Sequence, residues 1–550
     1  MRKTSMLVAG ALSLSAVACQ DLDVSNPNNP DRDVVVRSAA DVESLISTSF
    51  RRWFDRAQSS TPSVAQSTAA DEFTTGFTDF GGQDAGVEPR QPIDNGPVSP
   101  NSPNRVPIST YYSIISAVNI GVQAIDKYDL RLVSGATDVT DRTLAFAKFV
   151  QGLSHAQVAL MYDQGWVYSE VVDTDTIRFE PGSTHVQDLI RPYQEVRDTA
   201  IAQLTEALRI AENNTFTLPG NSAGEWIPGM TLTNQQFARI INSYIARTMV
   251  YAARSPAERA AVDWNRVIQH IDAGITEDFA PLGTPDIMES IYKHRAARHR
   301  TVTPGDFMRV DYMVVGPADQ SDRFIEWYNT PWSDRQPFVM VNVQDRRIIS
   351  SPTATCTNQQ ANSLAVEGEY MGCHTATVFA AARGTGQRSF YYYHRLGRDT
   401  GWNTGPLLIM TVDEMNLLKA EGLIRLGRAD EAVPLINITR VGNGGLPPVT
   451  VDGVPGPNCT PRKLNGECGS LWDALRYEKR MEMIGVDAGV AHWDARAWGS
   501  LVEGTPIHYP MPGNELELLG MPMYTTGGGQ AGAAPAPNPE QCPVTLPRCP

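Results

Sequence analysis

Residues 411–441 read TVDEMNLLKAEGLIRLGRADEAVPLINITRV, and this stretch predicts two helices joined by a tight turn. Thr411 and Glu414 have the spacing of a capping box, and Gly427 is placed to end the first helix. Apolar residues recur at helical spacing in both halves, so each helix has an apolar side that needs a neighbour. On the returning helix, residues 429–441, four residues are expected to point inward: Ala432, Leu435, Ile436 and Ile438.

The same pattern recurs along the chain. Helices are expected in the segments 146–165, 193–208, 233–249, 255–274 and 471–484, because each carries apolar residues at helical spacing. The third and fourth of these begin with capping signatures, and so few residues separate them that they should form an antiparallel hairpin. Helical pairs with wide apolar faces stack on one another, as in tetratricopeptide-like repeats. The expected fold is therefore all-α, a tetratricopeptide-like scaffold with few short strands.

Two long stretches interrupt this scaffold. Residues 58–110 are rich in Ser, Thr, Gly, Pro and Asp, with Phe73, Phe77 and Phe80 as isolated aromatics. Residues 276–406 lack sustained periodicity and concentrate aromatic side chains. Irregular insertions on a rigid scaffold usually carry binding surfaces, so both are expected to form the ligand-binding face. The Gly/Ala/Pro-rich tail, residues 525–550, is expected to be peripheral.

The N-terminus predicts secretion and a lipid anchor. Arg2 and Lys3 precede an apolar run, residues 6–18, that ends in small residues before Cys19. This is the pattern of a signal peptide over residues 1–18, and the run is too short to span a bilayer, which takes about 20 apolar residues. The cysteine at this position is typical of a bacterial lipoprotein, in which it is acylated, for example with palmitate. An ordinary signal with a chance cysteine is the alternative. The mature chain, residues 19–550, is expected to be one domain.

The other six cysteines fall into three close pairs. They are Cys356 with Cys373, Cys459 with Cys468, and Cys542 with Cys549. Even, local pairing favours three loop disulfides formed in an oxidising compartment over six unrelated buried thiols. No C-x-x-C occurs, and no histidine stands at metal-ligand spacing from a pair, so no metal site is expected.

Charge and motifs exclude several classes of function. The chain has 46 basic and 61 acidic residues, a net charge of −15, which repels nucleic acid and anionic headgroups. It contains no P-loop, G-x-S-x-G or H-E-x-x-H motif, and its nine histidines are scattered. The sequence therefore predicts neither an enzyme nor a cofactor. Because carboxylates are abundant, a glycoside hydrolase remains the enzymatic alternative, and a structural repeat scaffold for protein interaction is another.

Taken together, several short motifs resemble the SusD/RagB-type outer-membrane nutrient-binding lipoproteins. Their order and spacing carry the resemblance: DLDVSNPN at 21–28, TAADE at 68–72, YYSII at 111–115, a segment from AF at 145 to YDQG ending at 165, EMNLLKAEG at 414–422, NITR at 437–440, YEKRMEM at 477–483, WDAR at 493–496 and PMPGNEL at 510–516. Two positions depart from the family pattern. Gly422 replaces the usual alanine, and Ala488-Gly489-Val490 stands where Glu-Gly-x-Arg is usual.

The resemblance implies a protein without catalytic activity. Family members lie at the outer surface on a TonB-dependent, SusC-type transporter and hold glycans or peptides above it. This chain is accordingly expected to be lipid-anchored in the outer membrane, to face the cell exterior and to deliver an oligomeric nutrient to such a transporter.

The aromatic residues of the second insertion are the candidate ligand contacts, because sugar rings stack on flat side chains. Six are selected as a group: Trp327, Trp332, Tyr391, Tyr392, Tyr393 and Trp402. The alternative role of each ring is to anchor the insertion to the helices.

Overall fold

The computed structural model describes residues 36–75, 79–99, 102–172, 184–220, 225–283, 308–356, 368–373, 375, 389–395, 405–525 and 532–534. These residues fold mainly into helices, with strands only as short pairs, so the predicted all-α class is confirmed. Within these ranges, every helix is too short or too polar to cross a membrane. The predicted signal and Cys19, with Phe77, Trp402, Cys542 and Cys549, lie outside the described residues.

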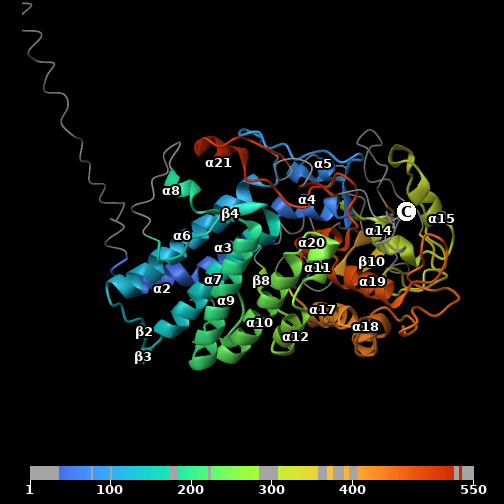
Figure 1. Ribbon diagram of the computed structural model, residues 1–550. Helices are drawn as coiled ribbons and strands as arrows, with labels where there is room; N and C mark the ends of the chain where they lie inside the picture. Colours follow the sequence, from blue (N-terminus) through green and yellow to red (C-terminus); the bar gives the residue numbers. More distant parts are fainter. Residues whose placement is uncertain are drawn as a thin grey trace, which may run out of the picture.

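A row of helices forms the scaffold, and each helix packs against the next in the row (Figure 1). The row consists of α6 (Arg105–Lys127), α7 (Thr140–Met161), α9 (Tyr193–Asn213), α10 (Asn234–Tyr251), α12 (Trp264–Asp272), α17 (Val412–Arg425) and α18 (Ala429–Gly442). Buried aromatic rings also join helices that are not consecutive in the row, as where Phe149 of α7 meets Phe237 of α10 with 5.0 Å between ring centroids. This is the stacking of helical pairs that the apolar spacing predicts.

Helices from both ends of the chain pack against this row. α2 (Ala39–Ser47) and α3 (Ser49–Ala57) contact α6 and α7, while α19 (Leu471–Met483) contacts α17 and α18. α20 (Ala488–Trp498) contacts α10. The shorter helical segments are α4 (Ser60–Ala69), η1 (Asp79–Gly81), α5 (Gly82–Gly86), α8 (Thr184–Gln187), α11 (Pro256–Ala260), α14 (Tyr312–Val315), η2 (Gly316–Ala318), α15 (Arg323–Asn329), η3 (Trp332–Asp334) and α21 (Gly513–Leu518).

The strands form two-stranded antiparallel pairs. They are β1 (Phe73–Thr75) with β9 (Met308–Val310), β2 (Val133–Ser134) with β3 (Thr137–Asp138), β4 (Gln164–Trp166) with β5 (Ile190–Pro192), β6 (Thr217–Leu218) with β7 (Leu232–Thr233), β8 (Leu282–Gly283) with β12 (Gly405–Pro406), and β10 (Met371–Cys373) with β11 (Tyr391–Tyr393). The β1–β9 pair connects the two predicted insertions, with Phe73 opposite Val310. The insertions therefore lie against each other, although they are far apart in the sequence.

The predicted helix starts are present. Thr233 and Gln236 form the complete capping box at the start of α10, and the Thr411 hydroxyl accepts a hydrogen bond from the Glu414 N–H at 3.1 Å. The helix predicted over 255–274 is instead two helices, α11 and α12. The Asp263 carboxylate accepts the Arg266 N–H at 3.0 Å, and this second N-cap begins α12 on a new axis.

Two further predictions were wrong in detail. Residues 58–110 were expected to be irregular but contain α4, α5 and the start of α6. Small side chains of α4, such as Ser63 and Ser67, are buried in the structure. Ile438 points outward with 48% of its surface exposed. The inner side of α18 instead presents Thr439, whose hydroxyl donates to Glu478 of α19 at 3.1 Å.

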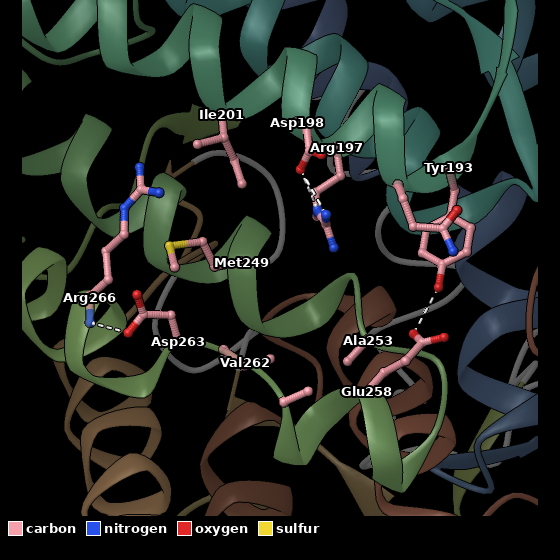
Figure 2. A pocket seen from close by; sticks show the side chains of 12 residues that line it. Tyr193, Arg197, Asp198, Ile201, Met249, Ala253, Glu258, Val262, Asp263 and Arg266 are labelled. Carbon is pink, nitrogen blue, oxygen red and sulfur yellow. Dashed lines mark hydrogen bonds and ion pairs between the residues drawn. The ribbon is translucent and has the colours of Figure 1, made fainter.

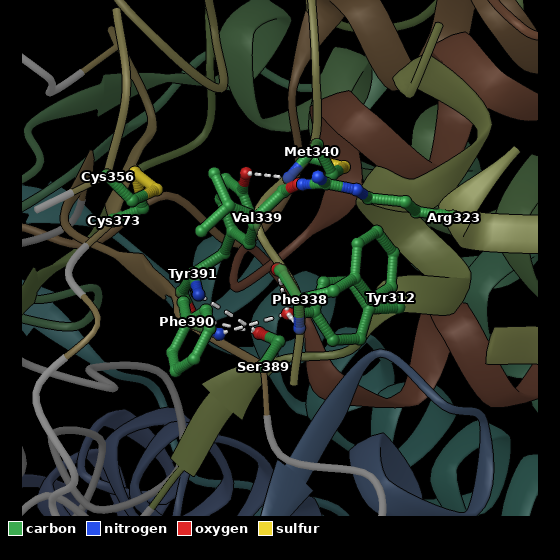
Figure 3. Close-up of a disulfide and its surroundings, with 10 residues drawn as sticks. All are labelled: Tyr312, Arg323, Phe338, Val339, Met340, Cys356, Cys373, Ser389, Phe390 and Tyr391. Atoms are coloured by element: carbon green, nitrogen blue, oxygen red, sulfur yellow. Dashed lines mark hydrogen bonds between the residues drawn. A yellow bond between two sulfur atoms is a disulfide. The ribbon is translucent and has the colours of Figure 1, made fainter. Parts of the chain in front are cut away.

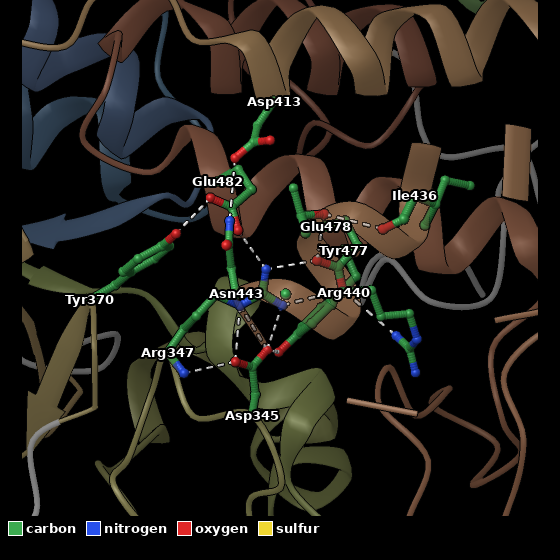
Figure 4. A network of polar contacts seen from close by, with 12 residues as sticks. Asp345, Arg347, Tyr370, Asp413, Ile436, Arg440, Asn443, Tyr477, Glu478 and Glu482 are labelled. Carbon is green, nitrogen blue, oxygen red and sulfur yellow. Dashed lines mark hydrogen bonds and ion pairs between the residues drawn. The ribbon is translucent and has the colours of Figure 1, made fainter. Parts of the chain in front are cut away.

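The Arg347 side chain is the centre of a fully buried charge network (Figure 4). Its guanidinium donates to Asp345 at 2.7 Å, to Glu478 at 2.7 Å and to Glu482 at 2.8 Å. The Tyr370 hydroxyl also donates to Glu482, at 2.8 Å. Because Glu478 and Glu482 belong to α19, the network fastens the irregular 345–370 region to the helical scaffold.

Gly422 has a steric reason to differ from the alanine expected by resemblance. A Cβ atom at this position would lie 2.8 Å from the Cε3 atom of Trp264 and 3.3 Å from Cδ1 of Ile268. The missing side chain therefore lets α17 approach the buried indole of α12. Gly442, at the end of α18, has no such neighbour, because no heavy atom lies within 4 Å of its Cβ position.

Replacing the two glycines should have opposite effects. Gly422→Ala should lower the free energy of unfolding by roughly 1 kcal/mol, since overpacking costs about 1–3 kcal/mol and the helix propensity of alanine returns up to about 1 kcal/mol. Gly442→Ala should leave stability unchanged or raise it by a few tenths of a kcal/mol, roughly. Urea denaturation of both variants measures this. Equal changes in the free energy of unfolding for Gly422→Ala and Gly442→Ala would show that the Trp264 side chain moves aside without cost.

Removing the buried guanidinium should be far more damaging. Arg347→Met roughly keeps the side-chain volume but leaves Asp345 without its ion-pair partner. Glu478 and Glu482 then keep only the more distant Arg440 and Arg395, at 3.7 and 3.6 Å, so the variant should cost about 3–5 kcal/mol at neutral pH. The matched control is Arg428→Met, which breaks the exposed pair with Glu431 and should have little effect on stability. Thermal or urea unfolding compares the two variants. A small effect of Arg347→Met would mean that the carboxylates are not held as ions.

Candidate ligand-binding site

Most of the aromatic residues selected from the sequence are buried. Trp327, Tyr391, Tyr392 and Tyr393 each expose 4% or less of their surface. Trp332, in η3, is half-buried, and Trp402 lies outside the described residues. Burial favours the anchoring role for the first four rings. The ligand-binding role of the group stays a prediction.

The contacts of Tyr391 show what these rings hold together (Figure 3). Its hydroxyl accepts the Met340 N–H at 3.1 Å, and its ring lies 6.1 Å from that of Tyr312. Tyr312 stacks on Phe338 with 4.2 Å between centroids and accepts the Phe338 N–H at 2.7 Å. These contacts bind three separate segments of the second insertion into one cluster.

Two of the three predicted disulfides are present. Cys356 is bonded to Cys373 beside the Tyr391 cluster (Figure 3), and Cys459 is bonded to Cys468. Each pair has 5.5 Å between its Cα atoms. Cys373 also faces Tyr391 in the β10–β11 register, so the first disulfide adds a covalent link to the aromatic cluster.

A cavity of about 370 Å³, here called the loop cavity, opens within the first insertion. Its walls come from α4, from the end of α5 with residues 90–103, and from three residues near the C-terminus: His492, Pro506 and Tyr509. The apolar part of the lining consists of Ala65, Ala69, Ala85, Pro92, Ile93, Pro103, Pro506 and Tyr509. The sequence assigned this insertion to the ligand-binding face but gave no reason to select the C-terminal residues.

Arg90 fixes one wall of the loop cavity. Its guanidinium forms an ion pair with Asp71 at 2.8 Å and donates to the Thr505 hydroxyl at 3.2 Å. Only 7% of Arg90 is exposed. The residue therefore ties the first insertion to the C-terminal segment, and its charge is neutralised within the wall.

His492 lies in the cavity lining with a buried, neutral side chain. Its Nε2 lies 2.9 Å from the Pro506 carbonyl oxygen, which can only accept, so Nε2 carries the proton. Burial, helped by the nearby Arg496, lowers the pKa of His492 to about 3 and keeps the ring neutral. Nδ1 is then an unprotonated acceptor, and it has no hydrogen-bond partner among the described residues. Nδ1 is itself buried, so it is not exposed to a ligand in the cavity.

The rim of the loop cavity is acidic. The Asp94 carboxylate accepts the Gly96 N–H at 3.0 Å and the Ser99 hydroxyl at 2.9 Å, and these bonds lower the pKa of Asp94. Asp84 is also exposed in the lining. Apolar walls and rim carboxylates together suit a ligand with apolar faces and many hydroxyl groups.

A second cavity, here called the helix cavity, has a volume of about 400 Å³ and lies between α9 and the α10–α12 segment (Figure 2). It shares no lining residue with the loop cavity. In the part of the chain that the structure describes, no group of three His, Cys, Asp or Glu side chains is placed to hold a metal ion.

Comparisons with known proteins bear on the fold. No protein-family model and no curated protein matches the sequence. Among solved structures, a SusD superfamily protein from Bacteroides vulgatus matches with a TM-score of 0.54 at 13% identity, over 90% of this chain and 99% of the other. A SusD homolog from Parabacteroides distasonis matches with a TM-score of 0.50 at 12% identity, over 83% and 84% of the two chains. Over most of its length this chain therefore has the fold of the SusD superfamily, as the order of its sequence motifs predicts.

Proposed function

We propose that this protein is an outer-membrane lipoprotein that captures an oligomeric nutrient, a glycan, at the cell surface. It then passes the glycan to a TonB-dependent, SusC-type transporter. The observation that carries the proposal is the loop cavity, in which apolar walls and an acidic rim meet at the junction of two chain-distant segments. The SusD fold and the lipoprotein pattern around Cys19 support the location and the partner.

A glycan fits this cavity better than a peptide does. Sugars offer hydroxyl donors for the rim carboxylates, and their C–H faces suit Ile93 and Tyr509. A general acid of a glycoside hydrolase needs a raised pKa, whereas the pKa of Asp94 is lowered. The proposed role is therefore binding without hydrolysis.

Filling the mouth of the loop cavity should abolish capture. Gln91→Trp places an indole at an exposed lining position, and the affinity for the best ligand of a glycan panel should fall about ten-fold or more. The matched control, Val98→Trp, adds the same ring to the same loop at a residue that is 84% exposed and outside the lining, so affinity should be kept. Isothermal titration calorimetry gives the affinities, and melting curves check the fold.

Three results would contradict the proposal. Equal affinities of the two tryptophan variants would place the ligand elsewhere. Release of free sugar during incubation with the wild-type protein would favour the glycoside hydrolase. Binding of peptides alone, with no glycan of the panel bound, would change the ligand class.

The anchor has its own test. Cys19→Ser should release the folded protein from the membrane fraction, because Cys19 precedes every described helix and would carry the lipid. Fractionation of cells that lack the partner transporter measures this, and the wild-type protein should stay in the membrane. Retention of the serine variant in those cells would overturn the lipid assignment, and failure of the wild-type protein to co-purify with a large outer-membrane barrel would overturn the partner.

A further inference from the structure

Residues 519–525, here called the strap, follow α21 and are held through one side chain. The Met521 N–H still bonds back to the Leu516 carbonyl oxygen of α21 at 2.8 Å. Beyond it, Met523 exposes 52% of its surface. Within the described residues, every hydrogen bond of the strap beyond Met521 involves Tyr524. Tyr524 is therefore the anchor of the strap.

The hydrogen bonds of the Tyr524 hydroxyl fix the direction of its proton. The hydroxyl oxygen accepts the Gln164 amide N–H at 2.9 Å and the Met511 N–H at 3.2 Å. Its one proton is therefore donated to Asp163, whose Oδ2 lies 2.7 Å away. Because Oδ2 has to accept, any proton on the Asp163 carboxyl group sits on the other oxygen, Oδ1.

The Asp163 Oδ1 atom is enclosed, and it has no hydrogen-bond partner among the described residues. The cation that acts on this carboxyl group is Arg254, from the connection between α10 and α11. Its Nη2 is already committed to the carbonyl oxygens of Ala159 and Tyr162, at 2.7 and 2.6 Å. Burial therefore outweighs the hydrogen bond from Tyr524 and the charge of Arg254, and it raises the pKa of Asp163 to about 6.

The other titratable groups packed around Asp163 supply no further counter-charge. The Tyr193 N–H of α9 donates to the Asp163 carbonyl oxygen, and the Asp163 N–H donates to that of Tyr509, both at 3.0 Å. Burial raises the pKa of both phenols, so they stay neutral. Glu258 lies on the far side of the Tyr193 ring system, where it accepts the Tyr193 hydroxyl at 2.7 Å and the Arg254 N–H at 2.8 Å.

Asn95 connects the strap to the loop cavity. Its side-chain amide donates to the Tyr524 carbonyl oxygen and to the Met511 carbonyl oxygen, both at 2.8 Å. Asn95 follows Asp94 in the segment 93–99, here called the rim loop, part of which lines the cavity. The anchor of the strap and the rim of the cavity are thus joined by direct hydrogen bonds.

We infer that the strap and Asp163 form a proton-dependent latch, which holds the rim loop of the loop cavity more firmly in acidic than in neutral surroundings. Opening of the strap removes the Tyr524 hydroxyl and exposes the carboxyl group to water, where the pKa of an aspartate is about 4. The closed form therefore binds a proton more tightly than the open form, so a lower pH favours closure.

The size of the effect follows from the two pKa values. With a pKa of about 6 in the closed form, the ratio of closed to open strap should be about ten-fold higher at pH 5 than at pH 7.5. Above the closed-form pKa the preference is lost, because both forms are then ionised. The use of the latch in capture rests on the proposed function, whereas the latch itself does not.

The test uses the full mature chain in detergent, without glycan. Chymotrypsin cleaves after Tyr524 only when this ring has left Asp163, so the cleavage rate measures the open strap. A peptide with the sequence of residues 518–527 corrects for the pH dependence of the protease. The corrected rate for the wild-type protein should rise about ten-fold from pH 5 to pH 7.5.

Two variants separate the latch from other effects of pH. Asp163→Asn keeps an acceptor for the Tyr524 hydroxyl but cannot ionise, so its corrected rate should be equal at the two pH values. The matched control is Asp198→Asn, at a carboxylate that is 64% exposed, and it should keep the ten-fold response of the wild-type protein.

Hydrogen exchange tests the connection to the cavity. In the rim loop, the Gly96 N–H is bonded to Asp94 at 3.0 Å and the Ser99 N–H to the Gly96 carbonyl oxygen at 3.1 Å. At pH 7.5 these amides should exchange several-fold faster in the wild-type protein than in Asp163→Asn, and at pH 5 the two proteins should agree.

Three results would overturn the inference. They are equal corrected cleavage of the wild-type protein at both pH values, a pH response that persists in Asp163→Asn, and rim-loop exchange that is the same in both proteins at pH 7.5. None of these measurements uses a glycan, so failure of the latch and failure of glycan capture are separate results.

Discussion

Buried arginine–carboxylate contacts are the constraint on which the rest of the structure depends. Arg347, Arg259 and Arg247 are all enclosed, and each joins elements that are distant in the chain. Arg259 of α11 reaches Glu421 of α17 and Asp494 of α20, both at 2.8 Å, and Arg247 of α10 reaches Glu414 of α17 at 2.9 Å. Removing one partner of such a buried pair costs about 3–5 kcal/mol, so these contacts favour the arrangement in which the helices meet as they do.

The same contacts explain why the sequence revealed the fold more readily than the ligand. The motif residues that carry the family resemblance, Glu414, Glu421, Glu478 and Asp494 among them, are interior counter-charges in the structure. They specify how α17, α19 and α20 meet, and none of these four residues lines either cavity. The chain can thus have this fold at 13% identity to a solved structure without the motifs specifying what its cavities bind.

Local signals in the sequence predicted the helices, whereas contacts between distant segments determine the structure of the insertions and of the loop cavity. Capping residues and apolar spacing located α10 and α17, but they did not show that Asp263 would start a new helix or that Ser63 and Ser67 would be buried in α4. The aromatic residues of the second insertion were recognisable as a group in the sequence. Their burial, however, depends on the β11 strand and on contacts with Tyr312, and sequence patterns predict neither. The loop cavity was beyond prediction in detail, because the Arg90–Thr505 contact that forms its wall joins residues 415 positions apart.

The neutral state of His492 has a consequence for the charge of the loop cavity when the pH changes. An ordinary histidine would gain a proton between pH 7 and pH 5 and turn from an acceptor into a donor. With its pKa lowered to about 3 by burial, His492 stays uncharged through that whole range. Acidification over this range would therefore add no positive charge to the cavity wall at this residue.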